Sequence, residues 1–133
     1  MVKEHYDRKV FYAEIRPLFG KLFQEHVDNI NTILDTWEPT PFKDRRCLAY
    51  ILATTKAETG NMVPKEEIGK GGGRHGEYYG RGYVQLTWKA NYERATQELN
   101  KRNLVGRQVN LVGYPEQALE PDIAATVIIY GME

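Results

Sequence analysis

Glycine is distributed very unevenly along this 133-residue chain. Residues 60 to 82 hold 8 of its 12 glycines, including those of the run GKGGGRHG. Glycine in such density disfavours a regular helix, because it loses the most conformational freedom on ordering and has no side chain to pack. The stretch therefore predicts a flexible loop between two helical parts of the chain.

Apolar residues recur at helical spacing before this loop. Three segments show the pattern: VFYAEIRPLFGKL, VDNINTILDTW and RRCLAYILATTKAE. Pro17 is expected to kink or break the first helix. Asp44 is placed to cap the third helix, and Gly60 to end it. Cys47, the only cysteine, lies in an apolar run and is interpreted as a buried structural thiol.

Aromatic and β-branched residues surround a Gly-Arg-Gly in YYGRGYVQLTW, which predicts a short hairpin. Alternation along a strand would put Tyr83, Gln85 and Thr87 on one face. Val84, Leu86 and Trp88 would lie on the other face, toward the core. Two further helices are expected, in NYERATQELNKR and in PDIAATVIIYGM. The sequence thus predicts a single, mainly α-helical domain over residues 1–133 with one small β-hairpin.

Charge and hydropathy exclude several classes of protein. The 18 basic and 18 acidic residues give zero net charge, which argues against a dedicated nucleic-acid binder despite the Gly-Arg-aromatic composition of GKGGGRHGEYYGRG. No apolar stretch approaches the ~20 residues of a membrane span. The charged N-terminal segment lacks the apolar core of a signal peptide. We therefore expect a protein made in the cytoplasm and not embedded in a membrane.

The stretch ETGNMVPKEE places acids on both sides of a Gly/Pro break. Glu58 ends the third predicted helix, and a carboxyl beside apolar surface has its charged form disfavoured, as a general acid requires. Nine residues of helix would turn about 900° and put Glu67 on the opposite face. Pro64 excludes an unbroken helix, so the two acids can cooperate only if the chain folds back between them. The alternative is a solvated turn, and Glu66 is assigned to the surface.

The predicted hairpin combines aromatic rings with neutral amides and hydroxyls. Such groups suit sugars, whose rings have apolar faces and hydroxyl rims, although ordinary packing of tyrosines in a sheet is the alternative. His75 has no partner at metal-ligand spacing. It is interpreted as loop surface, with a role in a substrate cleft as the less favoured alternative. No metal or other cofactor is expected.

Taken together, AETG, the EE that follows, and YYGRGYVQLTWKANY resemble the family 19 glycoside hydrolases. These are chitinases and related phage endolysins with a lysozyme-like, mainly α-helical fold. IRPLFGKL and ILDTWE resemble the phage branch, and NLVGYPEQALEPDIAA resembles the helix entry after the hairpin. Many members have histidine where Ala57 stands. Family domains usually continue beyond the helix ending in IIYGME, so the resemblance implies that C-terminal helices are lacking here.

By position, the resemblance implies that Glu58 is the general acid and Glu67 the general base. Thr87 matches the hydroxyl that helps to hold the attacking water. Substrate-binding or site-shaping roles are implied for Gln85, Asn91, Tyr79 and Arg81. The family inverts configuration, which requires the two carboxyls to be about 6.5–9.5 Å apart.

The resemblance implies an endolysin that hydrolyses β-1,4 glycosidic bonds of bacterial peptidoglycan. Chitin is the alternative substrate, and the phage-like segments and the lack of a signal peptide favour peptidoglycan. A catalytically weak module that binds cell-wall sugars is the other alternative. We expect a monomer that acts on the cell wall or periplasm and relies on a separate pore-forming partner, a holin, to reach it.

Overall fold

The computed structural model describes residues 7–42 and 44–131, so the outer limits of the predicted domain lie outside the described part. Its elements are α1 (Arg8–Phe19), α2 (Gln24–Trp37), α3 (Arg45–Thr59), β1 (Lys65–Glu66), the 3₁₀ helix η1 (Ile68–Gly73), β2 (Arg81–Gly82), α4 (Lys89–Lys101), the 3₁₀ helix η2 (Pro115–Leu119) and α5 (Pro121–Gly131). The predicted fold class, mainly helical with one small antiparallel β element, is confirmed.

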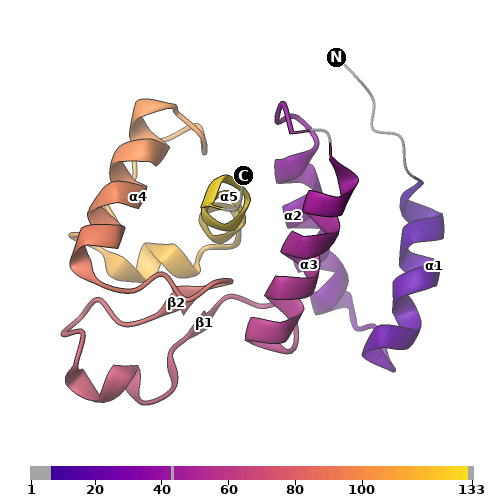
Figure 1. Ribbon diagram of the computed structural model, residues 1–133, viewed down its shortest axis with the longest axis horizontal. Helices are drawn as coiled ribbons and strands as arrows, with labels where there is room; N and C mark the ends of the chain where they lie inside the picture. The colour runs from indigo at the N-terminus through magenta and orange to yellow at the C-terminus, as the bar shows by residue number, and fades with distance from the viewer. Residues whose placement is uncertain (1–6, 43, 132–133) are drawn as a thin grey trace.

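Helix α5 lies at the centre of the molecule, between α4 on one side and α2 with α3 on the other (Figure 1). The predicted buried helix is confirmed, because α5 contributes to both hydrophobic clusters. Its Ile128 and Ile129 pack in one cluster with Trp37 of α2, whereas Ile123 packs in the other with Tyr92 of α4. The two halves of the chain therefore share one helix as a common wall.

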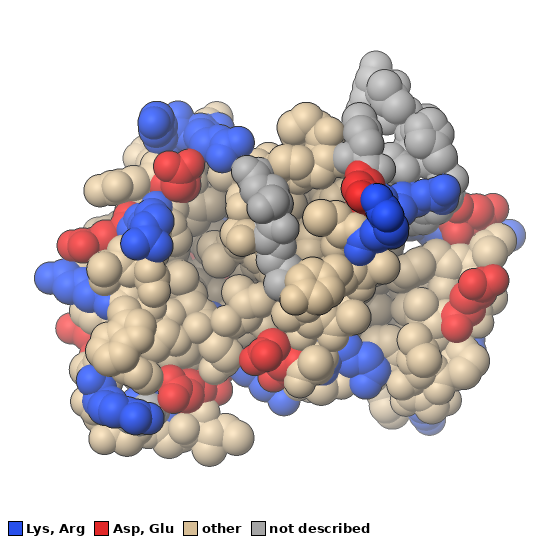
Figure 2. Space-filling model, in the orientation of Figure 1, with Lys and Arg blue, Asp and Glu red and all other residues tan. Residues whose placement is uncertain are grey.

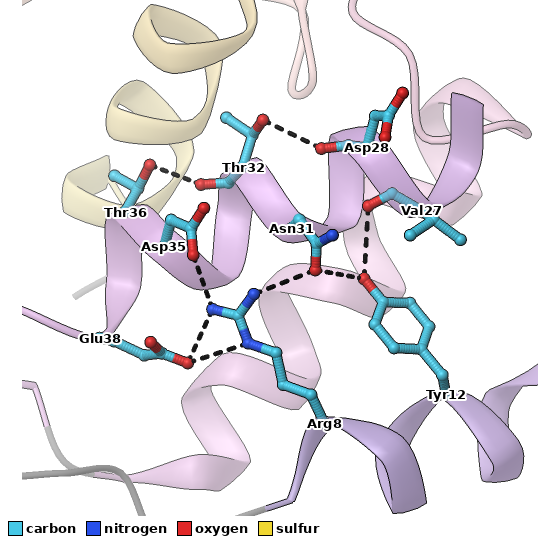
Figure 3. Close-up of polar contacts among 9 residues, drawn as sticks. All are labelled: Arg8, Tyr12, Val27, Asp28, Asn31, Thr32, Asp35, Thr36 and Glu38. Atoms are coloured by element: carbon cyan, nitrogen blue, oxygen red, sulfur yellow. Dashed lines mark hydrogen bonds and ion pairs between the residues drawn. The ribbon is translucent and has the colours of Figure 1, made fainter. Parts of the chain in front are cut away.

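Helix α1 is attached through partly buried apolar side chains and through polar contacts with α2. Its Phe11, Tyr12, Ile15 and Phe19 pack against the hydrophobic cluster that includes α2. None of its side chains is buried. Arg8 donates through Nη2 to Asp35 at 2.8 Å and to Glu38 at 2.9 Å, and through Nη1 to Asn31 at 3.0 Å (Figure 3). The Tyr12 hydroxyl donates to the same Asn31 side-chain oxygen at 2.8 Å.

Pro17 lies within α1, which ends two residues later at Phe19. Of the two outcomes expected for Pro17, a kink or a break, the break is wrong, because the helix continues past this residue. A proline in the last turn removes one backbone hydrogen bond but leaves few turns beyond it to disturb. Gly20, the first residue after the helix, donates its backbone N–H to the Pro17 carbonyl.

The limits of α3 follow the predicted signals. Asp44 accepts a hydrogen bond from the backbone N–H of Arg46 at 2.9 Å, and Gly60 ends the helix with φ of +76°. Beyond it, Met62 is buried, and its N–H donates to the Thr59 hydroxyl at 2.8 Å. The core thus fixes the turn that leads from α3 into β1. Cys47 departs from its prediction, because it is only partly buried.

The sheet is formed by a pairing that local sequence does not indicate. β1 pairs with β2 across the glycine-rich loop, with Lys65 opposite Gly82 and Glu66 opposite Arg81. After β2 the chain turns back at once, because Arg81 and Leu86 exchange both backbone hydrogen bonds, at 3.1 and 2.8 Å. In place of the predicted strand through residues 83–88, residues 83–85 form a tight turn and Leu86 pairs back with Arg81.

This turn changes the predicted places of Tyr83 and Trp88, whereas Val84 and Leu86 pack against the hydrophobic clusters as predicted. Tyr83 is 1% exposed and belongs to the core, whereas Trp88 is 52% exposed. The predicted alternation is wrong because a turn, with Gln85 at φ of +57°, replaces the regular period of a strand. Gly82 has φ of +95°, and a Cβ there would lie 3.1 Å from the Ala118 carbonyl oxygen. β2 can lie this close to η2 only because the residue is glycine.

The buried Tyr83 gives stability a dependence on alkaline pH. Its hydroxyl donates to the Asn29 side-chain oxygen at 2.8 Å, and burial raises its pKa. Burial likewise raises the pKa of Tyr12 to about 12. A raised folded-state pKa stabilises the protein below the unfolded value of about 10, and this stability is lost as pH rises further. We expect urea unfolding to show a free energy that falls above about pH 10.

Tyr83→Phe is expected to make this fall shallower, at a cost of about 1 kcal/mol near pH 7 from the lost hydrogen bond. Tyr50→Phe is the matched control, because Tyr50 is exposed, and it should keep the wild-type profile. Identical pH profiles for the Tyr83→Phe variant and the wild type would contradict the prediction.

Among the described residues, no helix combines the length and apolar character needed to cross a bilayer. On the face shown in Figure 2, basic and acidic side chains are interspersed over several elements.

Candidate active site

Glu67 follows β1 and extends the sheet by one contact. Its backbone N–H donates to the Gly80 carbonyl at 2.7 Å, and the Gly80 N–H donates to Glu67 Oε1 at 2.9 Å. The side chain is 29% exposed. No described residue donates a hydrogen bond to Oε2. One carboxylate oxygen is therefore held by the backbone, and the other is open to accept a proton.

His75 lies beside the held oxygen of Glu67. Its Nδ1 is 3.5 Å from Glu67 Oε1, and its side chain is only 11% exposed. The ring packs edge-on against Trp88, with centroids 4.2 Å apart and an interplanar angle of 78°. The interpretation of His75 as loop surface is thus wrong. The loop curls through η1 and through Gly76, at φ of +60°, and turns this side chain inward.

The neighbouring Glu66 has different partners. Its Oε2 accepts a hydrogen bond from the Tyr79 hydroxyl at 3.2 Å and lies 3.9 Å from Arg81 Nε. The side chain is 45% exposed, so Glu66 lies at the surface as expected but is not purely solvated. Adjacent glutamates therefore contact separate groups.

Tyr79 and Arg81 are both buried. Arg81 Nη1 donates to the Glu77 carbonyl at 2.9 Å and to the Tyr92 hydroxyl at 3.0 Å, and the guanidinium lies 3.9 Å from the Tyr79 ring centroid. Burial alone would lower the pKa of Arg81, but the hydrogen bond to Tyr92 and the further interactions with Tyr92 and Tyr79 together outweigh it, and the pKa is raised. In this arrangement both side chains support the site from inside the protein.

Gln85, Thr87 and Asn91 are linked by consecutive hydrogen bonds. Gln85 Nε2 donates to the Lys65 carbonyl at 3.0 Å, and a Cβ on Gly80 would lie 2.7 Å from Gln85 Oε1. The Gln85 side chain therefore touches the residue that holds Glu67. The Thr87 hydroxyl donates to the Gln85 carbonyl at 2.7 Å, and Asn91 Nδ2 donates to the Thr87 carbonyl at 2.9 Å.

These three residues also line a groove of about 400 Å³ beside the end of α5. A second groove, of about 390 Å³ between α4 and α5, shares Leu86, Asn91, Val127 and Gly131 with the first. Together they form an elongated depression with a mixed polar and apolar lining. Neither predicted catalytic glutamate lines it.

Glu58 occupies the last turn of α3 and is exposed. No other described side chain hydrogen-bonds or forms an ion pair with it. The expectation that it lies against apolar surface is wrong, because Thr55 and Thr59 take the buried positions of this turn. The structure thus brings Glu67 together with Gly80, Gln85 and His75, and leaves Glu58 at the solvent-facing end of the helix.

Within residues 7–42 and 44–131, no group of three or more His, Cys, Asp or Glu side chains is arranged to hold a metal ion. No protein-family model matches this chain, and searches of curated proteins and of solved structures gave no match either.

Proposed function

We propose that this protein is a glycoside hydrolase that cleaves β-1,4 bonds of bacterial peptidoglycan with inversion of configuration. The observation that carries the proposal is the asymmetric environment of Glu67, in which one oxygen is held by the Gly80 N–H and the other is free. An open carboxylate oxygen on a fixed side chain is what a general base needs. The amides and hydroxyl of the adjacent Gln85–Asn91 segment support a role in binding sugar hydroxyls.

In the proposed reaction, a water molecule attacks the anomeric carbon from the face opposite the leaving sugar. Glu67 Oε2 takes a proton from this water as the new C–O bond forms. Glu58 gives its proton to the glycosidic oxygen as the old bond breaks. One water is consumed, and proton exchange with solvent resets both carboxyls. A general acid must hold its proton until the bond breaks, so the proposal requires the bound sugar chain to cover Glu58, which is exposed in the free protein. A carboxyl separation of about 6.5–9.5 Å would leave room for the water.

The test is to incubate the purified protein with a peptidoglycan suspension and, in parallel, with chitin. We expect turbidity to fall and new reducing ends to appear with peptidoglycan. Proton NMR of the first product should show the inverted anomer. Reducing ends released only from chitin would show that chitin is the substrate of the same hydrolytic reaction. If neither polymer releases reducing ends, the proposed hydrolysis is refuted.

A sugar-binding module is the second candidate, and two observations favour it. Neither glutamate lines the elongated depression, and the exposed Trp88 offers a flat face for a sugar ring. Co-sedimentation with insoluble peptidoglycan, without any reducing ends after prolonged incubation, would select this function instead.

A further inference from the structure

His75 carries a buried polar atom without a hydrogen bond among the described residues, its ring nitrogen Nδ1. The carboxylate oxygen Glu67 Oε1 lies 3.5 Å from His75 Nδ1. This distance exceeds the ~2.7–3.2 Å of an N–H···O hydrogen bond. Leaving a buried donor or acceptor unsatisfied costs about 1–3 kcal/mol. A shift of less than 1 Å would bring the two groups into hydrogen-bonding range.

Trp88 prevents the imidazole from turning toward solvent on its other side. The two rings are in edge-on contact. The Trp88 backbone is fixed on both sides, because its N–H donates to the Tyr78 carbonyl at 2.8 Å and its carbonyl accepts from Asn91 and Tyr92 at 3.0 and 3.1 Å. Its φ of +75° is a strained conformation for a bulky residue. Such strain persists where the surroundings hold it, and it clusters at functional sites.

We propose that His75 is a positioning residue for Glu67, acting when the glycine-rich loop closes on a bound sugar chain. Its Nδ1–H then joins the Gly80 N–H on Oε1. With two donors on one oxygen, the carboxylate cannot rotate, and Oε2 alone faces the attacking water. This inference rests on the proposed hydrolase function and adds a residue that orients its base.

The kinetic test replaces His75 with Ala and with Asn, since an Asn side-chain NH₂ can occupy about the place of Nδ1–H. His75→Ala is expected to lower kcat about 10- to 100-fold, which is the loss of rate that a misplaced catalytic group causes. KM should change less than about twofold. His75→Asn should restore most of the rate. Arg74→Ala, next to it on the exposed loop, should match the wild type.

If Ala and Asn variants lose activity and thermal stability equally, His75 is merely structural and the proposal is overturned. Wild-type kcat in the Ala variant would overturn it as well. Melting curves recorded on every variant separate these outcomes.

A measurement without turnover tests the contact itself. In ¹⁵N-labelled protein saturated with a peptidoglycan fragment too short to be cleaved, the His75 Nδ1 resonance should shift in the Glu67→Gln variant and stay unchanged in the matched Glu66→Gln variant. No response to Glu67→Gln overturns the positioning role while leaving the proposed hydrolysis standing. Conversely, a wild-type protein without activity refutes the hydrolase, and the same spectra still decide whether His75 contacts Glu67.

Discussion

Replacing Glu67 with glutamine is expected to reduce peptidoglycan hydrolysis by roughly three orders of magnitude while leaving the fold intact. General acid–base catalysis contributes about 10²–10⁴ to rate, and an amide cannot take a proton from water. The glutamine oxygen can still accept the hydrogen bond that the Gly80 N–H donates at 2.9 Å. Reducing-end release measures the rate, and a melting temperature close to the wild-type value would show that the fold is preserved.

Glu58→Gln should be equally damaging for a different reason, because the leaving sugar would depart without a proton. Glu58 is exposed, and no described side chain hydrogen-bonds or forms an ion pair with it, so its replacement should not affect stability. Full wall lysis by this variant would end the two-carboxylate proposal.

Glu66→Gln is the matched control for both changes. Its carboxylate contacts Tyr79 and Arg81, not the Gly80 N–H. We expect activity within about threefold of the wild type, because only a partly exposed contact is weakened. A loss as large as that of Glu67→Gln would indicate that Glu66, not Glu67, is the general base.

The helices were predictable because their signals are local. Asp44 and Gly60 mark the limits of α3 by capping chemistry that involves only neighbouring residues. The apolar periodicity of α2 likewise indicates which face is buried, and the continuous apolar run of α5 indicates a helix buried on nearly all sides. Pro17 misled because its effect depends on how many turns follow it, which the sequence pattern does not state.

The sheet was not predictable from local pattern. The pairing of β1 with β2 joins residues on either side of the glycine-rich loop, and no turn motif links them. Once that pairing forms, the chain must reverse at Arg81–Leu86, which carries Tyr83 into the core and leaves Trp88 exposed. A one-residue change of register reverses every face of a strand. The inward position of His75 depends on the same long-range pairing of β1 with β2.

The candidate site could be predicted from the sequence only in part. The nine-residue spacing within ETGNMVPKEE indicated which glutamate to choose, but not why the two neighbours differ. In the structure, Glu67 faces Gly80 whereas Glu66 faces Tyr79, as expected of successive residues on an extended backbone. The spacing of Glu58 did not reveal its exposure, because that depends on which side of the last α3 turn packs on the core.

Truncating Arg81 is expected to produce the largest loss of stability of any change near the site. The side chain is buried, with two hydrogen bonds from Nη1 and a guanidinium stacked on the Tyr79 ring. Hydrogen bonds to charged groups contribute about 1.5–3 kcal/mol and a desolvated cation–π contact about 2. Because the Tyr92 hydroxyl still donates to the Tyr79 carbonyl at 2.6 Å, part of the network survives. We expect Arg81→Ala to cost about 3 kcal/mol, or a melting temperature lower by about 10 °C.

Two further variants show whether this loss comes from the buried network. Arg81→Lys keeps the charge but not the planar, five-donor guanidinium, so it should recover less than half of the lost stability. Arg94→Ala is the matched control. Its guanidinium is exposed and, among the described side chains, hydrogen-bonds to that of Asn91, at 2.9 Å, and exposed changes usually cost within about 0.5 kcal/mol. Urea unfolding gives the free energies, and kcat and KM are measured well below each melting temperature. An Arg81→Ala protein with wild-type stability but a strongly raised KM would show that Arg81 contacts the substrate instead of supporting the site from within.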